Sequence, residues 1–328
     1  GAAAFFQGWH LVALNRYVSL AGNATFVGTG PEAALSGYLG VSILGTSDFI
    51  GLTGAAISAA QVTVGGAAGF SNITSEFGAI NVGSRAGDSV DDALAGLSVR
   101  SIVHISGSAR FERCASRRSG GAISVNASLT GRVDIAGSAT FVECSSGVSG
   151  GAIAAGSVSI SGVAVFDRCS ASLGGGAISS GGGASSRSLD ITGTAHFARC
   201  NASHGSAVAS SDQVEISGDV RFSGFQCSPD LGTTGSVLFL QPGSNAYLSG
   251  LRFADISCGT AVWAQAASNL TLTRGVFRGI SQGSSSAAIN ADVGKHVNVS
   301  STLAQDVQSF LTAQYTAGIY LLNLSLRG

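Results

Sequence analysis

One pattern of apolar and polar positions occurs four times between residues 103 and 208. Each copy opens with a triplet in which two aliphatic residues flank a polar one. A glycine follows, then a phenylalanine four residues later and a cysteine three residues after that, and the copy closes with a glycine-rich stretch, an alanine and an aliphatic residue. The first copy reads Val103-His104-Ile105, Gly107, Phe111, Cys114 and Gly120-Gly121-Ala122-Ile123. The later copies have their phenylalanines at Phe141, Phe166 and Phe197.

The spacing is fixed within a copy but varies between copies, where successive phenylalanines lie 30, 25 and 31 residues apart. Stacked coils produce such a pattern, because each coil presents the same inward side chains to its neighbours while its outward turns vary in length. The triplets alternate with the period of a β-strand, and the many glycines disfavour helix. The sequence therefore predicts an all-β protein, a right-handed parallel β-helix (solenoid) with inward ladders of Val, Ile, Ala and Phe.

The four-residue interval from glycine to phenylalanine extends beyond the four copies, to Phe26, Phe49, Phe70 and Phe222. We expect about ten or eleven coils in one β-helix domain, residues 1–328, with no linker. Residues 1–17 are expected to form an N-terminal cap or the remainder of a preceding coil. Residues 300–328 are expected to form a C-terminal cap, a further coil or an assembly segment.

A charged stretch interrupts the pattern at residues 82–100, where we predict a loop insertion. Its carboxylates, Asp88, Asp91 and Asp92, are of the type that binds calcium. Their spacing matches no known calcium loop, however, and a solvated surface loop is the favoured interpretation.

The paired signatures Gly-Gly-Ala-Ile and Phe-x-x-Cys, as at Gly150–Ile153 and Phe141–Cys144, resemble a known repeat family. They are similar to the GGA(I/L/V) and FxxN repeats of the polymorphic outer-membrane proteins of chlamydiae, with cysteine in place of asparagine. The resemblance covers about four coils strongly. It implies a β-helical fold and, as an expectation only, an adhesive function at a surface, since fold and function separate readily.

Composition narrows the classes of partner. The chain is 45% hydrophobic and 11% charged with a net charge of −1, so it has ample material for a core and no basic stripe for nucleic acid. The apolar start, residues 1–20, is interrupted by Gln7, His10 and Arg16 and is not expected to span a membrane.

Asparagine is concentrated in glycosylation sequons. Seven of the eleven asparagines open an Asn-x-Ser/Thr sequence, namely Asn23, Asn72, Asn126, Asn201, Asn269, Asn298 and Asn323. Such sites carry N-linked glycans when the chain passes through a eukaryotic secretory pathway and the asparagine faces water. We therefore expect an extracellular location, secreted or at the cell surface.

Six cysteines fall one per coil on successive coils, namely Cys114, Cys144, Cys169, Cys200, Cys227 and Cys258. Stacked coils bring only neighbouring cysteines within reach of each other. The one complete pairing of neighbours is Cys114–Cys144, Cys169–Cys200 and Cys227–Cys258. An extracellular chain favours these disulfides, and a ladder of buried reduced thiols is the alternative.

Catalytic chemistry has weak support in the sequence. Acidic residues are scattered over the outward triplet positions, where Asp134 and Asp190 lie two coils apart with Ser159 between them. The histidines lack metal-binding spacing. We expect no catalytic residues, no metal and no cofactor. The favoured hypothesis is an extracellular structural or adhesive repeat glycoprotein, a subunit of a surface fibre or coat that binds itself or other surface or matrix proteins. The alternatives are a β-helical carbohydrate-active enzyme, either lyase or glycosidase, and a carbohydrate-binding module.

Overall fold

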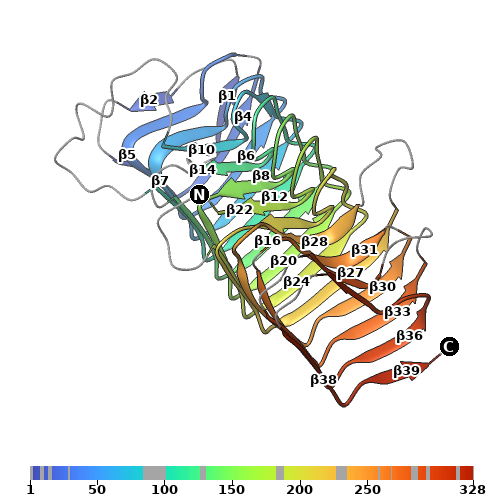
Figure 1. Ribbon diagram of the computed structural model, residues 1–328. Helices are drawn as coiled ribbons and strands as arrows, with labels where there is room; N and C mark the ends of the chain where they lie inside the picture. Colours follow the sequence, from blue (N-terminus) through green and yellow to red (C-terminus); the bar gives the residue numbers. More distant parts are fainter. Residues whose placement is uncertain are drawn as a thin grey trace.

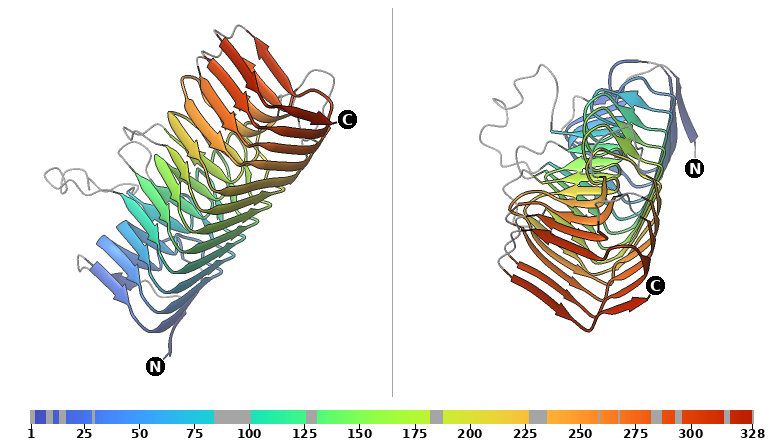
Figure 2. Two further views of the ribbon diagram at one scale, coloured as in Figure 1. Left: turned by 90° about the horizontal axis from the view of Figure 1, so that it is seen from below. Right: turned by 45° about the vertical axis from the view of Figure 1, so that its right-hand side comes forward.

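The computed structural model describes residues 3–7, 11–13, 17–28, 30–83, 101–125, 131–181, 188–226, 235–257, 259–266, 268–281, 287–292, 296–314 and 318–327. Within these residues the chain forms strands β1 to β39 and no helix. The strands stack into an elongated solenoid (Figure 1), and the left view of Figure 2 shows its two termini at opposite ends of the stack. The predicted insertion at 82–100 lies outside the described residues from residue 84 onward.

Thirteen strands form a sheet in which each strand comes from the next coil along the chain. We call it the phenylalanine sheet. It contains β1 (Ala3–Gln7), β4 (Asn23–Val27), β6 (Thr46–Ile50), β8 (Ala67–Ser71), β12 (Ser108–Glu112), β16 (Ser138–Val142), β20 (Val163–Asp167), β24 (Thr194–Ala198), β27 (Asp219–Phe225), β30 (Arg252–Ile256), β33 (Val276–Ile280), β36 (Leu303–Val307) and β39 (Ser325–Arg327).

Two further ladders, joined through the long strands β5 (Leu35–Ile43) and β7 (Ile57–Val64), form the rest of the wall. The first ladder adds β2 (Leu11–Ala13), β10 (Ile80–Val82), β14 (Ile123–Val125), β18 (Ile153–Ala155), β22 (Ile178–Ser180), β25 (Val208–Ser210), β28 (Ser236–Leu240), β31 (Thr260–Ala264), β34 (Ile289–Asp292) and β37 (Leu311–Gln314). The second ladder adds β3 (Tyr17–Leu20), β11 (Ile102–Ile105), β15 (Arg132–Ile135), β19 (Ser157–Ile160), β23 (Leu189–Ile191), β26 (Gln213–Ile216), β29 (Asn245–Ser249), β32 (Asn269–Thr273), β35 (His296–Ser300) and β38 (Gly318–Leu322).

A short sheet closes the central coils. It contains β9 (Thr74–Ser75), β13 (Ala115–Ser116), β17 (Ser145–Ser146) and β21 (Ser170–Ala171). One coil thus runs through β15, β16, β17 and β18, and each of these strands pairs in parallel with its equivalent one coil on. This arrangement confirms the predicted parallel β-helix.

A column of phenylalanine rings fills the core beneath the phenylalanine sheet. Neighbouring rings from Phe26 to Phe277 stack with centroids 4.6–5.0 Å apart and interplanar angles of 2–10°. The rings are almost fully buried, and burying each one stabilises the fold by about 1.5–3 kcal/mol. The four-residue interval from glycine to phenylalanine therefore marks the inward position of one strand per coil.

The repeated glycines stand where the backbones of neighbouring coils touch. A Cβ on Gly107 would lie 2.1 Å from the carbonyl oxygen of Gly66, and one on Gly137 would lie 2.1 Å from that of Gly107. At the Gly-Gly-Ala-Ile corner, Gly150 has φ of 66°, and its Cβ would lie 2.1 Å from the oxygen of Ile153. These contacts explain why glycine recurs at fixed places in the copies.

In the described part of the chain the phenylalanine sheet has thirteen strands, and the number of about ten or eleven coils expected from the sequence stays a prediction. The outermost strands lie in the two end segments. Strand β1 pairs with β4 through Ala3–Gln7, and β39 pairs with β36 through Ser325–Arg327. The last two strands carry Ala304 and Leu326 in register with Phe277, so the phenylalanine that marks a coil in the sequence is missing there.

Candidate functional site

Each central coil leaves the phenylalanine sheet at a residue with a left-handed backbone. Six such residues, each two positions after a stacked phenylalanine, have φ of 52–54°: Asn72, Arg113, Glu143, Arg168, Arg199 and Asp255. Gly51 and Gly224 hold the same position in other coils. A side chain other than glycine costs of order 1–3 kcal/mol in this conformation, and asparagine tolerates it best. Glycine or asparagine recurs at this offset from phenylalanine in the sequence, which is the signal that marks the left-handed position.

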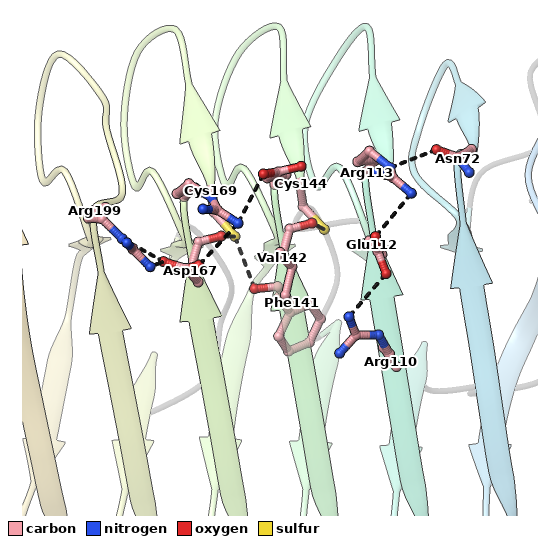
Figure 3. Close-up of polar contacts among 12 residues, drawn as sticks. Asn72, Arg110, Glu112, Arg113, Phe141, Val142, Cys144, Asp167, Cys169 and Arg199 are labelled. Carbon is pink, nitrogen blue, oxygen red and sulfur yellow. Dashed lines mark hydrogen bonds and ion pairs between the residues drawn. The ribbon is translucent and has the colours of Figure 1, made fainter.

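A cysteine follows directly after four of these residues. We call the turn formed by residues 112–114, 142–144, 167–169 and 198–200 the thiol corner. Its outer surface is charged and its inner surface is lined by thiols (Figure 3).

Ion pairs join neighbouring side chains along the outside of the thiol corner. Glu112 contacts both Arg110 and Arg113 at 3.0 Å, and Nε of Arg113 donates to Oδ1 of Asn72 at 2.8 Å. Because the arginines are more than half exposed, each pair contributes only about 0–1 kcal/mol.

A second group of pairs crosses three coils. Arg168 contacts Glu143 at 3.0 Å and Asp167 at 3.5 Å, and Arg199 contacts the same aspartate at 2.6 Å. Arg113, Glu143, Arg168 and Arg199 occupy equivalent positions on neighbouring coils. The structure shows that Glu112 and Asp167, one position earlier, complete the network.

The four described cysteines form a buried column under these charges. Cys114, Cys144, Cys169 and Cys200 are at most 2% exposed and are free thiols. Each Sγ lies near the carbonyl oxygen of the phenylalanine one coil back, at 3.6–3.8 Å, and near that of the residue two positions before it, at 3.4–3.8 Å. The thiols therefore repeat one orientation. Burial and the hydrogen bonds of the neighbouring thiols raise the pKa of Cys169 well above its ordinary value.

The disulfides Cys114–Cys144 and Cys169–Cys200 stay predictions. Neighbouring coils are displaced by 4.8–4.9 Å at the stacked rings beside the column, whereas a disulfide brings its two sulfurs to about 2.05 Å. Forming these bonds requires a local shift of the corner. Cys227 and Cys258 lie outside the described residues.

The acidic residues of the second ladder also line up on one outward row. Asp134, Ser159, Asp190 and Glu215 occupy the same register position on four successive strands. Asp134 forms an ion pair with Arg132 on its own strand. The expected separation of Asp134 and Asp190 by two coils is confirmed, and Glu215 is the direct neighbour of Asp190.

The histidines form separate contacts. His196 Nε2 lies 3.0 Å from Ser223 Oγ, and the ring of His204 lies 5.4 Å from that of Phe239. In the described ranges, no group of three or more His, Cys, Asp or Glu residues is placed to hold a metal ion.

Most sequon asparagines reach solvent. Of the six that the structure describes, five are exposed: Asn23, Asn72, Asn201, Asn298 and Asn323. Asn269 is partly buried, and its Nδ2 donates to Oδ1 of Asn245 at 2.6 Å. Asn126 lies outside the described residues. Five of the sequon asparagines are thus placed in water, as N-linked glycosylation requires.

The fold and the thiol corner define the class: a parallel β-helical repeat protein with a charged ladder over a buried cysteine column. No family model, curated protein or solved structure matches this chain. Among the described residues, no helix has the length and apolar character needed to cross a membrane.

Proposed function

We propose that this chain is an extracellular structural or adhesive repeat glycoprotein, a rod-shaped subunit of a surface fibre or coat. The observation that carries the proposal is the exposure of five sequon asparagines on different coils of one solenoid. Glycans at these positions would keep a weakly charged rod soluble, since only 11% of its residues are charged. Its partners are N-linked glycans and either further copies or other surface and matrix proteins.

To test the proposal, the protein is produced in a eukaryotic secretory system and examined for N-linked glycans. The intact mass of the secreted protein is measured before and after treatment with an enzyme that releases N-linked glycans, and peptides are mapped at Asn72. Thr74→Ala removes the sequon of Asn72, whereas the control Thr74→Ser keeps it. We expect the mass to fall on treatment and the Asn72 glycopeptide to vanish only in Thr74→Ala. An unchanged mass contradicts the proposal.

A carbohydrate-active enzyme is the second candidate, because Asp190 and Glu215 are neighbours in register with Asp134 two coils away. Two coils span about 10 Å, close to the carboxylate separation of inverting glycosidases. Polysaccharide cleavage is measured by the release of reducing ends and of unsaturated products. Activity that is lost in Asp190→Asn and in Asp134→Asn supports the enzyme, and no cleavage in the unsubstituted protein argues against it.

A further inference from the structure

We propose that the thiol corner binds soft monovalent metal ions, Cu(I) or Ag(I), each held in a linear arrangement between the Sγ atoms of cysteines on two neighbouring coils. This inference does not depend on the proposed function.

Spacing is the first argument. The four thiols make the same two carbonyl contacts, so neighbouring sulfurs are related by the displacement of one coil. That displacement is 4.9 Å from Phe111 to Phe141 and 4.8 Å from Phe141 to Phe166. Two metal–sulfur bonds of about 2.3 Å placed end to end span about 4.6 Å. The column therefore suits one ion between two sulfurs better than a direct sulfur–sulfur bond.

Donor chemistry is the second argument. Thiolate sulfur is the ligand that selects Cu(I) and related soft ions. The described residues offer no cluster of three or more metal-binding side chains, so a four-coordinate zinc site is not supported. A two-coordinate ion needs only the two sulfurs that the coil repeat already aligns.

Charge is the third argument. A monovalent ion with two thiolates carries one net negative charge, which is costly to bury without compensation. Within the corner the guanidinium groups of Arg113, Arg168 and Arg199 balance the carboxylates of Glu112, Glu143 and Asp167. Arg110, on strand β12 beside Glu112, adds one further positive charge. This additional positive charge lies on the strand that enters the corner, four residues before Cys114.

The binding step exchanges protons and transfers no electrons. Two S–H bonds break, two metal–sulfur bonds form, and both protons pass to solvent, so the oxidation state of metal and sulfur is unchanged. The exposed ion-pair row is the outer cover of the column, and opening it admits the ion.

The test uses Ag(I) in chloride-free buffer with the reduced full-length chain. The background substitutions Cys227→Ser and Cys258→Ser remove the two cysteines outside the described residues. Native mass spectrometry counts bound ions, and far-UV circular dichroism checks that each variant retains its strands. Two ions are expected for the four thiols, because each ion uses two sulfurs and no sulfur is shared between ions.

Two double variants with equal numbers of thiols provide the matched control. Cys114→Ser/Cys144→Ser leaves Cys169 and Cys200 on neighbouring coils, and one ion is expected. Cys144→Ser/Cys200→Ser leaves Cys114 and Cys169 two coils apart, and loss of the bound ion is expected. Equal binding by the two variants overturns the proposal.

A second measurement does not need the double variants and therefore remains informative if they fail to fold. X-ray absorption at the silver edge of the four-thiol protein should show two sulfur neighbours and no nitrogen or oxygen ligand. Three or four sulfurs, or no bound silver, overturns the proposal. Peptide mapping that finds a Cys114–Cys144 or Cys169–Cys200 disulfide in the protein as isolated also overturns it, because the sulfurs are then already consumed.

Discussion

The rings of Phe141 and Phe166 stack face to face, with centroids 4.8 Å apart and an interplanar angle of 2°. The same displacement recurs along the column, so one ring contact measures the step from coil to coil. Each phenylalanine contacts the ring before it and the ring after it. The column therefore couples the stability of neighbouring coils, as expected of a solenoid.

Replacing one phenylalanine of the column by a smaller residue should destabilise the central coils. Phe141→Ala leaves a cavity between two buried rings and is expected to lower the free energy of unfolding by about 3–5 kcal/mol. Phe141→Leu keeps most of the apolar volume and should cost clearly less. Urea denaturation of both variants measures the difference, and equal losses would argue against a packed column.

Adjacent glycines in one turn should differ sharply in their tolerance of a methyl group. A Cβ on Gly66 would lie 2.1 Å from the oxygen of Gly45, whereas the nearest atom to a Cβ on Gly65 is 3.5 Å away. Gly66→Ala should therefore force the coils apart and lower the thermal midpoint strongly, while Gly65→Ala should change it little. Similar midpoints for the two variants would show that the coils do not touch there.

The left-handed backbone of Arg113 should limit which side chains this position tolerates. Arg113 has φ of 52°, which a β-branched side chain adopts only with strain. Arg113→Val should lower the free energy of unfolding by about 1–3 kcal/mol, whereas Arg113→Asn should be close to neutral, since Asn72 occupies the same position one coil earlier. Denaturant midpoints compare the two variants. A neutral valine would contradict the turn geometry.

The carboxyl group of Asp219 should titrate at unusually low pH. Its hydrogen bond from Arg221, at 2.9 Å, holds its pKa below the ordinary value. A lowered pKa in the folded state means that the pair stabilises the fold above the unfolded pKa of about 3.9 and that this stabilisation is lost as the pH falls through the folded pKa. Exposure keeps the effect small. Carboxyl NMR titration should show the lowered pKa, and Arg221→Ala should restore the ordinary one.

The sequence was sufficient for the features that neighbouring coils impose on each other. Phe111 and Phe141 pack in one column and Gly107 contacts Gly66 across coils, so residue identity repeats and the fold could be predicted. The terminal coils were harder to predict, because the residue that marks a coil in the sequence is phenylalanine, and Leu326 stands at that position in the last strand. The charged network was only partly predictable, since an exposed pair such as Arg199 with Asp167 needs no fixed residue type.

The disulfide prediction shows a different limit. Sequence spacing places Cys144 beside Cys114 and Cys169 alike, but it does not report the orientation of the sulfurs. The four described cysteines repeat one orientation, which relates neighbouring sulfurs by one coil step. Peptide mapping without reduction tests whether the corner shifts to form a bond.

Equivalent residues of neighbouring coils are displaced by one constant step, and distances measured over four and five coils test this step. Arg110, Arg221 and Arg252 hold the same exposed position on β12, β27 and β30, with Thr140, Val165 and His196 between the first two. Spin labels are attached at residues 110 and 221, and in a second protein at residues 110 and 252, through a reactive amino acid other than cysteine. Pulsed electron paramagnetic resonance then gives the distance between the two labels of each pair. Four and five coils predict backbone separations of about 19 Å and 24 Å, at about 4.8 Å per coil. Separations that do not grow by one coil step between the two pairs would contradict the stacked-coil account.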